Sequence, residues 1–442
     1  MKQAASASIL EAPNSGNGES VRLRAPMSLS RVVMLDLERP NGHILTYLQY
    51  LTDYWCERGL AGTLDLIVMP DFATMHADYV EAIGAKAGYG VRIRTISRRE
   101  QNLLDNHGPG LRRWLRQGPI VSRYLAELRP DACLFTHFDH VQLALAMGLR
   151  FDYDLRLAGI YFRPMFDYGT FGHGLERLQS RLRKTATGVM LRAALRNPHL
   201  KILFCLDPDS VGHVKKLNNS ISAIALPDPV KNHPERPTAE QIKRRLSIKP
   251  GRQVLLLFGD LTRRKGTFQL LDALALLPQA GKAKVCLLMA GLIPHDDKEE
   301  LLKRVRALEK SSAIQVVLHD RFVDTGEIQS FFDAAGLVLL PYQRQIGMSG
   351  ILVWAAASAV PVLSSDYGLI GRVTKREGLG VTMDSSSPAA IAEALRYCIS
   401  RPADELFNRD SARAFAALNS AENFAATIYR HLIPGHEPRV GC

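Results

Sequence analysis

Short, continuous apolar runs alternate with segments of helical spacing along most of the chain. In the first half, the strand-like runs occupy residues 31–37, 64–70, 91–96, 132–137, 155–162 and 201–207, with helical patterns between most of them. Strands that are apolar throughout and alternate with helices are typical of a parallel sheet covered on both faces. The pattern therefore predicts an α/β fold whose first, Rossmann-like domain spans residues 29–230.

The same alternation restarts after LPDPVKNHPERPTAEQ (226–241), which reads as a linker because of its four prolines. Strand-like runs at 254–259, 284–291, 313–319, 336–342 and 360–365 predict a second doubly wound domain over residues 231–415, facing the first across a cleft. A helical run extends from about Ala389 to Leu432, and residues 416–442 are expected to return to the first domain as a helix. Residues 1–28, rich in Ser, Gly and Ala, are expected to form a disordered tail.

Composition adds a preference for anionic partners. The 442 residues include 56 basic and 44 acidic side chains, which gives a formal net charge of +12. Such an excess favours phosphorylated ligands or an anionic membrane surface. No motif typical of nucleic-acid binding occurs, so no nucleic-acid partner is expected.

Several features predict a cytoplasmic location. The six cysteines lie far apart without a Cys-x-x-Cys pair, which favours reduced, buried thiols. No apolar run reaches membrane-spanning length, and the N-terminal segment lacks the apolar core of a signal peptide. The basic, amphipathic run over 175–201 is a candidate for peripheral contact with anionic lipid, and a solvated helix face is the alternative.

Two loop-to-helix junctions in the second half carry features of an anion site. In FGDLTRRKG (258–266), Gly259 permits a tight turn, and three cations precede a helix: Arg263, Arg264 and Lys265. Free N–H groups and the dipole at a helix N-terminus favour an anion there. In GMSG, the small residues Gly347, Ser349 and Gly350 allow close backbone approach before a second helix. The alternatives are a solvated basic loop and a small-residue helix packed in the core.

Five segments in this order resemble the nucleotide-sugar domain of the family-4 retaining glycosyltransferases, which have the two-domain GT-B fold. The segments are FGDLTRRKG, LLMAGL, VVLHDRFV before EIQSFFDAAGLVLLPY, GMSGILVWAAASAVPVLSSDYG and GLGVTMD. Together they cover about 130 residues, and the combination is specific although no single segment is. The first half matches more loosely, through Asn41-Gly42-His43 and His137.

The resemblance implies a donor site on the second domain. Lys265 would hold the donor diphosphate, and Arg263 or Arg264 would replace a family arginine where this chain has Asp260. The family's two glutamates, eight positions apart, are absent, because Ile346 and Trp354 stand in their places. The predicted donor-binding residues are Gly259, Arg263, Arg264, Lys265, Arg321, Phe322, Val323, Gly347, Met348, Ser349 and Gly350, with the three at 321–323 near the nucleobase. The resemblance implies a nucleotide-diphosphate sugar as donor, with no further cofactor and no metal.

Catalytic and acceptor-side candidates lie in the first domain. His137 and Asp139 follow the strand at 132–135 and are candidates for an acid, a base or a sugar contact. For Asp139 the alternative is an N-cap of the following helix. Gly42, His43 and Arg163 are acceptor-side candidates, and Arg163 lies in an aromatic, glycine-rich stretch, AGIYFRPMFDYGTFGHG, for which a packed surface loop is the alternative.

Three classes of function stay open at this point. The first is a glycosyltransferase that moves a sugar from a nucleotide-sugar to a carbohydrate or lipid-linked acceptor. The second is a catalytically silent GT-B protein that acts as a binding or scaffold partner, because both glutamates are replaced. The third is a sugar-nucleotide epimerase of the same fold, whose cleft carboxylates and histidines do not map onto this chain.

Overall fold

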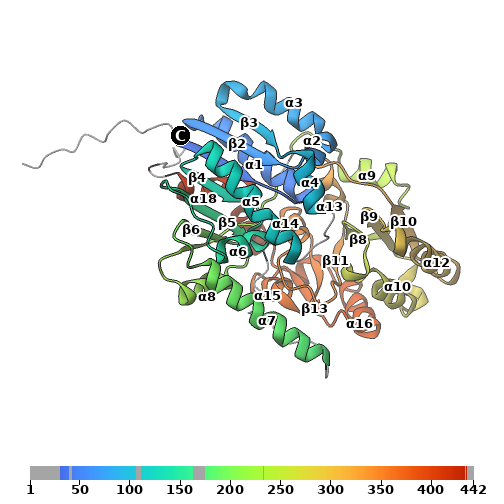
Figure 1. Ribbon diagram of the computed structural model, residues 1–442. Coiled ribbons are helices and arrows are strands. Elements are labelled where there is room, and N and C mark those ends of the chain that lie inside the picture. Colours follow the sequence, from blue (N-terminus) through green and yellow to red (C-terminus); the bar gives the residue numbers. More distant parts are fainter. Residues whose placement is uncertain are drawn as a thin grey trace, which may run out of the picture.

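The computed structural model contains two parallel sheets, each covered by helices on both faces (Figure 1). It describes residues 30–38, 42–105, 111–162, 175–231, 233–433 and 435. In these ranges no helix is both long and apolar enough to cross a membrane. The α/β architecture with two Rossmann-like domains is confirmed.

The first sheet has seven parallel strands in the order β3-β2-β1-β4-β5-β6-β7. Its strands are β1 (Ser30–Leu35), β2 (Gly62–Val68), β3 (Val91–Thr95), β4 (Ala132–Phe135), β5 (Arg156–Tyr161), β6 (Leu200–Cys205) and β7 (Ser222–Ala225). The helices between them are α1 (Gly42–Glu57), α2 (Pro70–Met75), α3 (Ala77–Ala85), α4 (Arg98–Asp105), α5 (Leu111–Leu128), α6 (Phe138–Ala146), α7 (Leu175–Ala194) and α8 (Asp209–Leu217). The chain reverses its winding direction between β1 and β4.

The second sheet has six parallel strands in the order β10-β9-β8-β11-β12-β13. Its strands are β8 (Gln253–Phe258), β9 (Val285–Ala290), β10 (Gln315–His319), β11 (Leu337–Leu340), β12 (Val362–Ser365) and β13 (Gly380–Met383). Its helices are α9 (Ala239–Arg245), η2 (Arg263–Lys265), α10 (Thr267–Ala275), α11 (Gln279–Lys282), α12 (His295–Ser311), α13 (Ile328–Asp333), α14 (Gly350–Ala357), α15 (Gly368–Arg376), α16 (Pro388–Ile399) and α17 (Arg409–Leu418). The last helix of the chain is α18 (Ala421–Leu432). Here the winding reverses between β8 and β11.

The prediction of one helical run from about Ala389 to Leu432 is wrong in its continuity. The segment forms three helices, α16, α17 and α18. Pro402 follows α16, and the side chains of Asn408 and Ser420 cap the N-termini of α17 and α18. Each cap satisfies a free N–H group where a new helix begins, so residues of the sequence itself determine where the helical run is interrupted.

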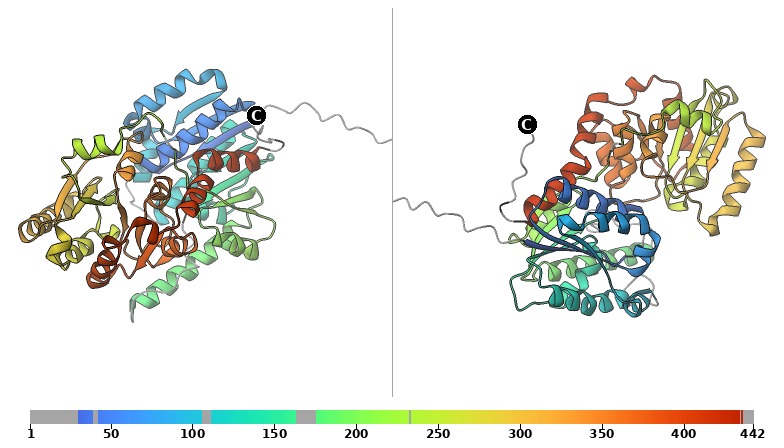
Figure 2. Two further views of the ribbon diagram at one scale, coloured as in Figure 1. Left: turned by 180° about the vertical axis from the view of Figure 1, so that it is seen from behind. Right: turned by 90° about the horizontal axis from the view of Figure 1, so that it is seen from above.

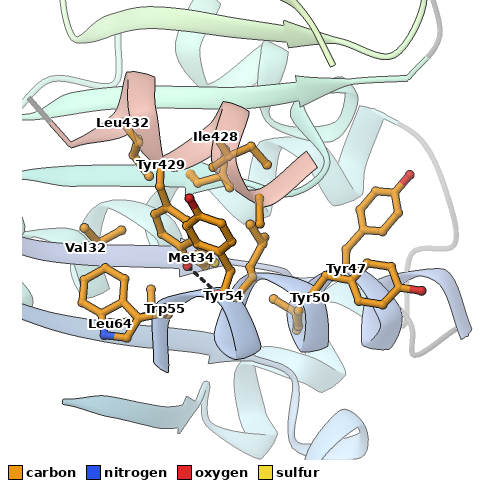
Figure 3. Close-up of a cluster of buried hydrophobic side chains, with 14 of the residues drawn as sticks. Val32, Met34, Tyr47, Tyr50, Tyr54, Trp55, Leu64, Ile428, Tyr429 and Leu432 are labelled. Carbon is orange, nitrogen blue, oxygen red and sulfur yellow. Dashed lines mark hydrogen bonds between the residues drawn. The ribbon is translucent and has the colours of Figure 1, made fainter. Parts of the chain in front are cut away.

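Helix α18 is part of the core of the first domain, although it follows the second sheet in the chain (Figure 2). Its Tyr429 is fully buried, and the ring stacks on Tyr54 at 5.7 Å between centroids (Figure 3). The Tyr429 hydroxyl donates a hydrogen bond to the backbone oxygen of Leu51 at 2.9 Å. Buried aromatic rings with a satisfied polar group contribute strongly to a core, so α18 holds the end of the chain on α1.

The chain therefore crosses between the domains twice, once through the linker and once between α17 and α18. These two crossings run side by side. The backbone N–H of Val230 donates to Asn419, and that of Ala421 donates back to Val230, both at 3.0 Å. Val230 lies in the predicted linker, while Asn419 and Ser420 join α17 to α18. This short parallel bridge fixes the linker against the returning chain.

Candidate functional site

The two predicted anion loops follow neighbouring strands at the point where the winding of the second sheet reverses. The loop at 259–266 follows β8, and the segment that ends in Gly347–Gly350 follows β11. Ligands of doubly wound sheets bind outside the carboxyl ends of the strands at such a point. The topology thus brings together two loops that lie more than 80 residues apart in the sequence.

Lys265 is a buried ammonium group in the first of these loops. Its side chain is 9% exposed, and Nζ donates a hydrogen bond to the backbone oxygen of Phe258 at 2.9 Å. Nζ also lies 5.3 Å from the centroid of the Tyr342 ring, on the neighbouring loop. Among the described residues no carboxylate pairs with this ammonium. A buried cation with spare N–H donors and no acidic partner is suited to an anionic ligand.

The local fold of the loop holds Lys265 in this position. Thr262 caps the 3₁₀ turn η2, with its side chain accepting from the Lys265 backbone N–H at 3.3 Å. Gly266 ends the turn with φ of +74°, and a Cβ there would lie 1.8 Å from the Pro341 oxygen. Glycine is therefore required where the turn meets the chain that follows β11.

The two arginines of this loop point to different neighbours. Arg263 donates to the carboxylate of Asp297 at 2.7 Å, and its guanidinium lies 4.2 Å from the centroid of the Phe268 ring. Arg264 hydrogen-bonds the side-chain oxygen of Gln345 and thereby ties the two anion loops together. Arg263 is thus directed toward α12 and α10, and Arg264 toward the segment that precedes GMSG.

The second loop leads into α14, which begins at Gly350 with Ser349 as its N-cap residue. The Ser349 side chain makes no capping bond, and its hydroxyl lies 3.3 Å from the Tyr342 hydroxyl instead. Met348 lies between the two glycines and packs against the core of the second domain. The first turn of α14 therefore keeps N–H groups that no side-chain cap satisfies.

Neither glycine of GMSG is required by backbone conformation or by crowding. Gly347 and Gly350 have no positive φ. A Cβ at Gly347 would lie 3.4 Å from the Phe162 oxygen, and one at Gly350 would lie 4.0 Å from Asp228 Oδ2. Both distances are compatible with a methyl group. These two glycines thus lie where the second domain meets the Phe162 chain and the linker.

The two positions at which the resemblance led us to expect glutamates, Ile346 and Trp354, lie in or against an apolar core. Trp354 is 8% exposed, and its ring stacks on Phe332 at 6.3 Å with 26° between the planes. Ile346 packs against the same core cluster. Neither residue brings a polar group to the loops described above.

The segment predicted near the nucleobase follows the edge strand β10. Arg321 is exposed, Phe322 is 64% exposed, and Val323 is buried. An exposed phenylalanine beside an exposed arginine offers a face on which a flat ring can stack.

In the first domain, Asp36 and His137 follow β1 and β4, the two strands between which the winding reverses. His137 Nδ1 lies 3.3 Å from Asp36 Oδ2, and the Thr136 hydroxyl donates to the same oxygen. Burial alone would lower the pKa of His137, but the hydrogen bond and charge of Asp36 raise it above its ordinary value of 6.5. Burial would raise the pKa of Asp36, yet the hydrogen bond and charge of His137 bring it below 3.8. The arrangement favours an ion pair with Nδ1 held by Asp36.

Two flat rings lie nearly parallel to the ring of His137. Phe162 stacks on it at 4.7 Å with 4° between the planes, and His140 at 5.7 Å with 8°. His140 Nδ1 in turn lies 2.6 Å from Glu38 Oε1. A second histidine–carboxylate pair thus lies beside the first. Asp36 and Glu38 were not predicted, although two acids directly after an apolar strand (MLDLE) were a usable signal.

Asp139 has a different role from the predicted N-cap. Helix α6 begins at Phe138 and has His137 at its N-cap position, so Asp139 lies inside the first turn. Its Oδ2 accepts a hydrogen bond from the backbone N–H of Phe162 at 2.9 Å. The N-cap prediction is wrong because the helix starts two residues earlier, and the carboxylate instead holds the chain that carries the ring against His137.

The other first-domain candidates are described only in part. Gly42 is the first residue of α1. The side chain of His43 and the whole of Arg163 lie outside the described residues. Of the predicted membrane-facing helix, the side chains of Arg192 and Arg196 are described and exposed.

Phe162 connects the two halves of the candidate site. Its ring lies on His137, its backbone N–H is held by Asp139, and its oxygen faces Gly347 of the second domain. Two hollows of about 280 and 270 Å³ lie elsewhere, one between α10 and α16 and one between α5 and α6. The described parts of the chain contain no group of three or more His, Cys, Asp or Glu residues able to hold a metal ion. What they do bring together is an anion-binding side on one domain and a histidine–carboxylate pair on the other.

Comparisons with known proteins agree with this architecture. Residues 238–415 match the model of the family described as glycosyl transferases group 1. A search of curated proteins found no match. Three similar solved structures show the same fold at 12–15% identity. They are the N-terminal domain of Candida albicans trehalose-6-phosphate phosphatase (TM-score 0.69, 12% identity, 92% of this chain and 98% of that one), a glycosyltransferase from Rickettsia africae (0.62, 13%, 92% and 99%) and Anabaena HepE in complex with UDP (0.62, 15%, 91% and 99%). The chain thus has the two-domain GT-B fold, and its second domain matches glycosyl transferases group 1.

Proposed function

We propose that the protein is a glycosyltransferase that moves a sugar from a nucleotide-sugar donor to a carbohydrate or lipid-linked acceptor. The transferred sugar is a hexose, its configuration is retained, and no metal takes part. The observation that carries the proposal is the buried ammonium of Lys265, with no acidic partner among the described residues, on the ring of Tyr342, whose hydroxyl lies 3.3 Å from that of Ser349 at the uncapped N-terminus of α14. Two solved structures of similar fold, HepE with UDP and HepE with UDP and glucose, support a nucleotide-sugar ligand.

Donor binding needs no acidic side chain at the diphosphate. A diphosphate carries most of the charge of a nucleotide-sugar, and the N–H groups at Ser349 and Gly350 with the Lys265 ammonium supply the opposite charge. Arg264 reinforces this side of the site by joining the two loops through Gln345. Arg321, Phe322 and Val323 would contact the nucleobase. Helix N-termini and ammonium groups thereby take over the charge neutralisation that a metal supplies in other transferases.

The reacting side of the site would come from the first domain. His137 carries a raised pKa and is held by Asp36, so at neutral pH it can donate a proton or a strong hydrogen bond to the donor sugar or the acceptor. Positioned acid or base groups contribute roughly 10²–10⁴-fold to rate. Asp139 positions the Phe162 chain beside it. Gly42, His43 and Arg163 remain acceptor-side candidates on this proposal.

Isothermal titration calorimetry with UDP, GDP and ADP tests the donor site. We expect one of them to bind, and Lys265→Ala to weaken it by about 10- to 150-fold, which corresponds to about 1.5–3 kcal/mol for a charge-assisted bond. Lys282→Ala is the matched control, because Lys282 is also buried and also donates to a backbone oxygen, that of Ala275 at 2.9 Å. If the wild-type protein binds none of the three nucleotides, the proposal that it is a glycosyltransferase is contradicted.

A catalytically silent nucleotide-binding protein is the second candidate. The observation that favours it is the replacement of both family glutamates by Ile346 and by the core residue Trp354. Nucleotide binding without donor hydrolysis or sugar transfer to a broad acceptor panel would decide for this candidate.

A cytoplasmic protein with peripheral membrane contact fits the proposed acceptor classes. The basic face of α7 and the chain after it, with Arg192 and Arg196 exposed, would meet anionic lipid. Flotation with anionic liposomes tests this contact. Reversal of the charges within residues 177–196 should abolish co-flotation, and unchanged flotation would rule the contact out.

A further inference from the structure

Asp228 lies in the linker between the two sheets and is fixed there by both crossings. Its backbone N–H donates to the side-chain oxygen of Asn419 at 2.9 Å, on the returning chain. Its Oδ1 accepts a hydrogen bond from the Tyr47 hydroxyl of α1, also at 2.9 Å. Burial and the nearby Asp228 charge raise the pKa of Tyr47 well above its ordinary value, so this hydroxyl stays protonated and donates. The carboxylate is therefore held by the first domain rather than by the donor domain.

The other carboxylate oxygen faces the donor domain. Oδ2 lies 4.0 Å from the place where a Cβ of Gly350 would stand, at the first residue of α14. The preceding residue, Ser349, directs its hydroxyl to Tyr342, whose ring is 5.3 Å from the Lys265 ammonium. The start of α14 thus has an ammonium on the Tyr342 side and a carboxylate on the Gly350 side.

The ammonium side and the carboxylate side of the α14 start suit different parts of a nucleotide-sugar. The ammonium and the helix N-terminus attract a diphosphate, whereas a carboxylate repels one. A carboxylate is instead a strong acceptor for hydroxyl groups, of which a sugar offers several. Because Ile346 and Trp354 are apolar, the carboxylate that faces this loop comes from outside the matched family segment, at residue 228.

We propose that Asp228 recognises the hydroxyl groups of the transferred sugar, and so supplies from the interdomain linker the carboxylate that the donor domain lacks. This inference rests on the proposed function. It makes Asp228 a specificity-determining residue of the donor site, with Tyr47 as the residue that positions it.

A purely structural role predicts a different behaviour. If Asp228 only tied the linker to α1, its removal would loosen the linker and affect every ligand of the site alike. Asp53 provides the comparison, because this α1 residue also binds the linker, accepting from Lys231 Nζ at 3.0 Å. An Asp53→Asn variant therefore loosens a linker contact that does not face Gly350.

The experiment compares a nucleotide-sugar with its own nucleoside diphosphate. Calorimetry on the full chain uses the pairs UDP-glucose and UDP, GDP-mannose and GDP, and ADP-glucose and ADP. Asp228→Asn should lower the affinity for the nucleotide-sugar on the order of 10- to 100-fold, as expected for the loss of a charged hydrogen bond. Affinity for the nucleoside diphosphate should not fall, because the carboxylate does not bind the phosphates and the loss of its charge removes a repulsion. Asp53→Asn should leave the ratio of the two affinities at the wild-type value.

A second variant keeps the carboxylate in place. Tyr47→Phe removes only the hydroxyl that orients Asp228, so it should produce a smaller loss, again confined to the nucleotide-sugar. This variant decides the question if Asp228→Asn does not fold. Equal losses for both ligands, or no loss for the nucleotide-sugar, would overturn the role of Asp228 while leaving the proposed function intact. A wild-type protein that binds neither ligand would overturn both.

Discussion

Gly259 leaves the space in which the ammonium of Lys265 lies. A Cβ on Gly259 would be 2.3 Å from Lys265 Nζ, too close for any side chain to be tolerated without displacing the ammonium. Gly259 also has φ of +90°, a conformation that other residues adopt only with strain. The position of the buried cation thus depends on Gly259, the residue directly after β8.

Substitution of Gly259 by alanine should therefore remove donor binding through Lys265 without changing Lys265 itself. We expect Gly259→Ala to lower the free energy of unfolding by about 1–2 kcal/mol, because of the positive φ. It should also lower the affinity for the nucleoside diphosphate as much as Lys265→Ala does. Chemical denaturation and calorimetry measure the two effects.

The matched control is Gly251→Ala. Gly251 has a similar φ of +77°, but a Cβ there would meet nothing within 4 Å. This variant should lose comparable stability and keep full affinity. Unchanged affinity in Gly259→Ala would show that the ammonium does not hold the ligand.

Gly350→Ala tests whether the space at the start of α14 belongs to a ligand. The glycine has no positive φ, and among the residues that the structure describes an added methyl would meet only Asp228 Oδ2, at 4.0 Å. The fold should therefore tolerate alanine, with stability unchanged or raised by about 0.4–1 kcal/mol. Nucleotide affinity should fall at least about tenfold, which is 1.4 kcal/mol, because a methyl blocks approach to the N–H groups. Gly212→Ala in α8, where a Cβ also meets nothing within 4 Å, should leave affinity unchanged, and equal affinity in both variants would contradict a ligand at Gly350.

The strands of the interior could be predicted from sequence because both of their faces are covered. β8 and β9 are apolar over nearly their whole length, and so their runs stand out at 254–259 and 284–291. β7 and β13 were not predicted. Each has four residues and lies at the edge of its sheet, where partly exposed positions interrupt the apolar run. The edge strands β3 and β10 were predicted at 91–96 and 313–319, so the short length of β7 and β13 together with their partial exposure explains why these two were missed.

The candidate site could likewise be predicted only in part. Sequence indicated the loops at Lys265 and Gly350, since each lies directly after a strand and before a helix. The partners supplied by distant segments carried no local pattern: Asp36 for His137, and Asp228 for Gly350, are brought there only by strand order and by the two crossings. Trp354 shows the converse, because its burial against Phe332 gives this position a role in the core of the second domain that its neighbours in sequence did not indicate.

The Asp36–His137 pair predicts a pH dependence with a defined window. His137 has a raised pKa, so its stabilising effect is complete below about pH 6.5 and is lost as pH rises through the raised value. Asp36 has a lowered pKa, so its effect is present above about pH 3.8 and is lost as pH falls through the lowered value. Asp36→Asn should therefore cost most stability between about pH 4 and 6.5, and less above it. Each pKa unit lost by His137 corresponds to about 1.4 kcal/mol.

Two measurements check this pair. Urea unfolding of wild type and Asp36→Asn at pH 5.5 and pH 9 gives the difference in the free energy of unfolding, which should be larger at pH 5.5. Nuclear magnetic resonance should show His137 titrating above pH 6.5 in the wild type and at a lower pH in the variant. His76 is the internal reference, because burial lowers its pKa and it should titrate below 6.5 in both proteins. A His137 midpoint that does not move would contradict the pairing with Asp36.

Arg372 of α15 joins the second domain to the first. Its guanidinium lies 3.5 Å from Asp207 Oδ2 and 3.1 Å from Asp209 Oδ2, at the end of β6 and the start of α8. Arg372→Ala should change the free energy of unfolding by less than about 1 kcal/mol, because the guanidinium is partly exposed. It should instead weaken the contact between the two domains, which small-angle X-ray scattering would record as a larger radius of gyration.

The loosened variant separates donor binding from transfer. Lys265 and the start of α14 lie on the second domain, so affinity for a nucleoside diphosphate should be nearly unchanged in Arg372→Ala. Transfer also needs His137 from the first domain, so kcat should fall. The matched control is Arg376→Ala in the same helix, since Arg376 pairs only locally, with Glu377 at 2.7 Å. If both variants scatter as the wild type does, the Arg372 contacts do not hold the domains together, and a fall in kcat would then need another cause.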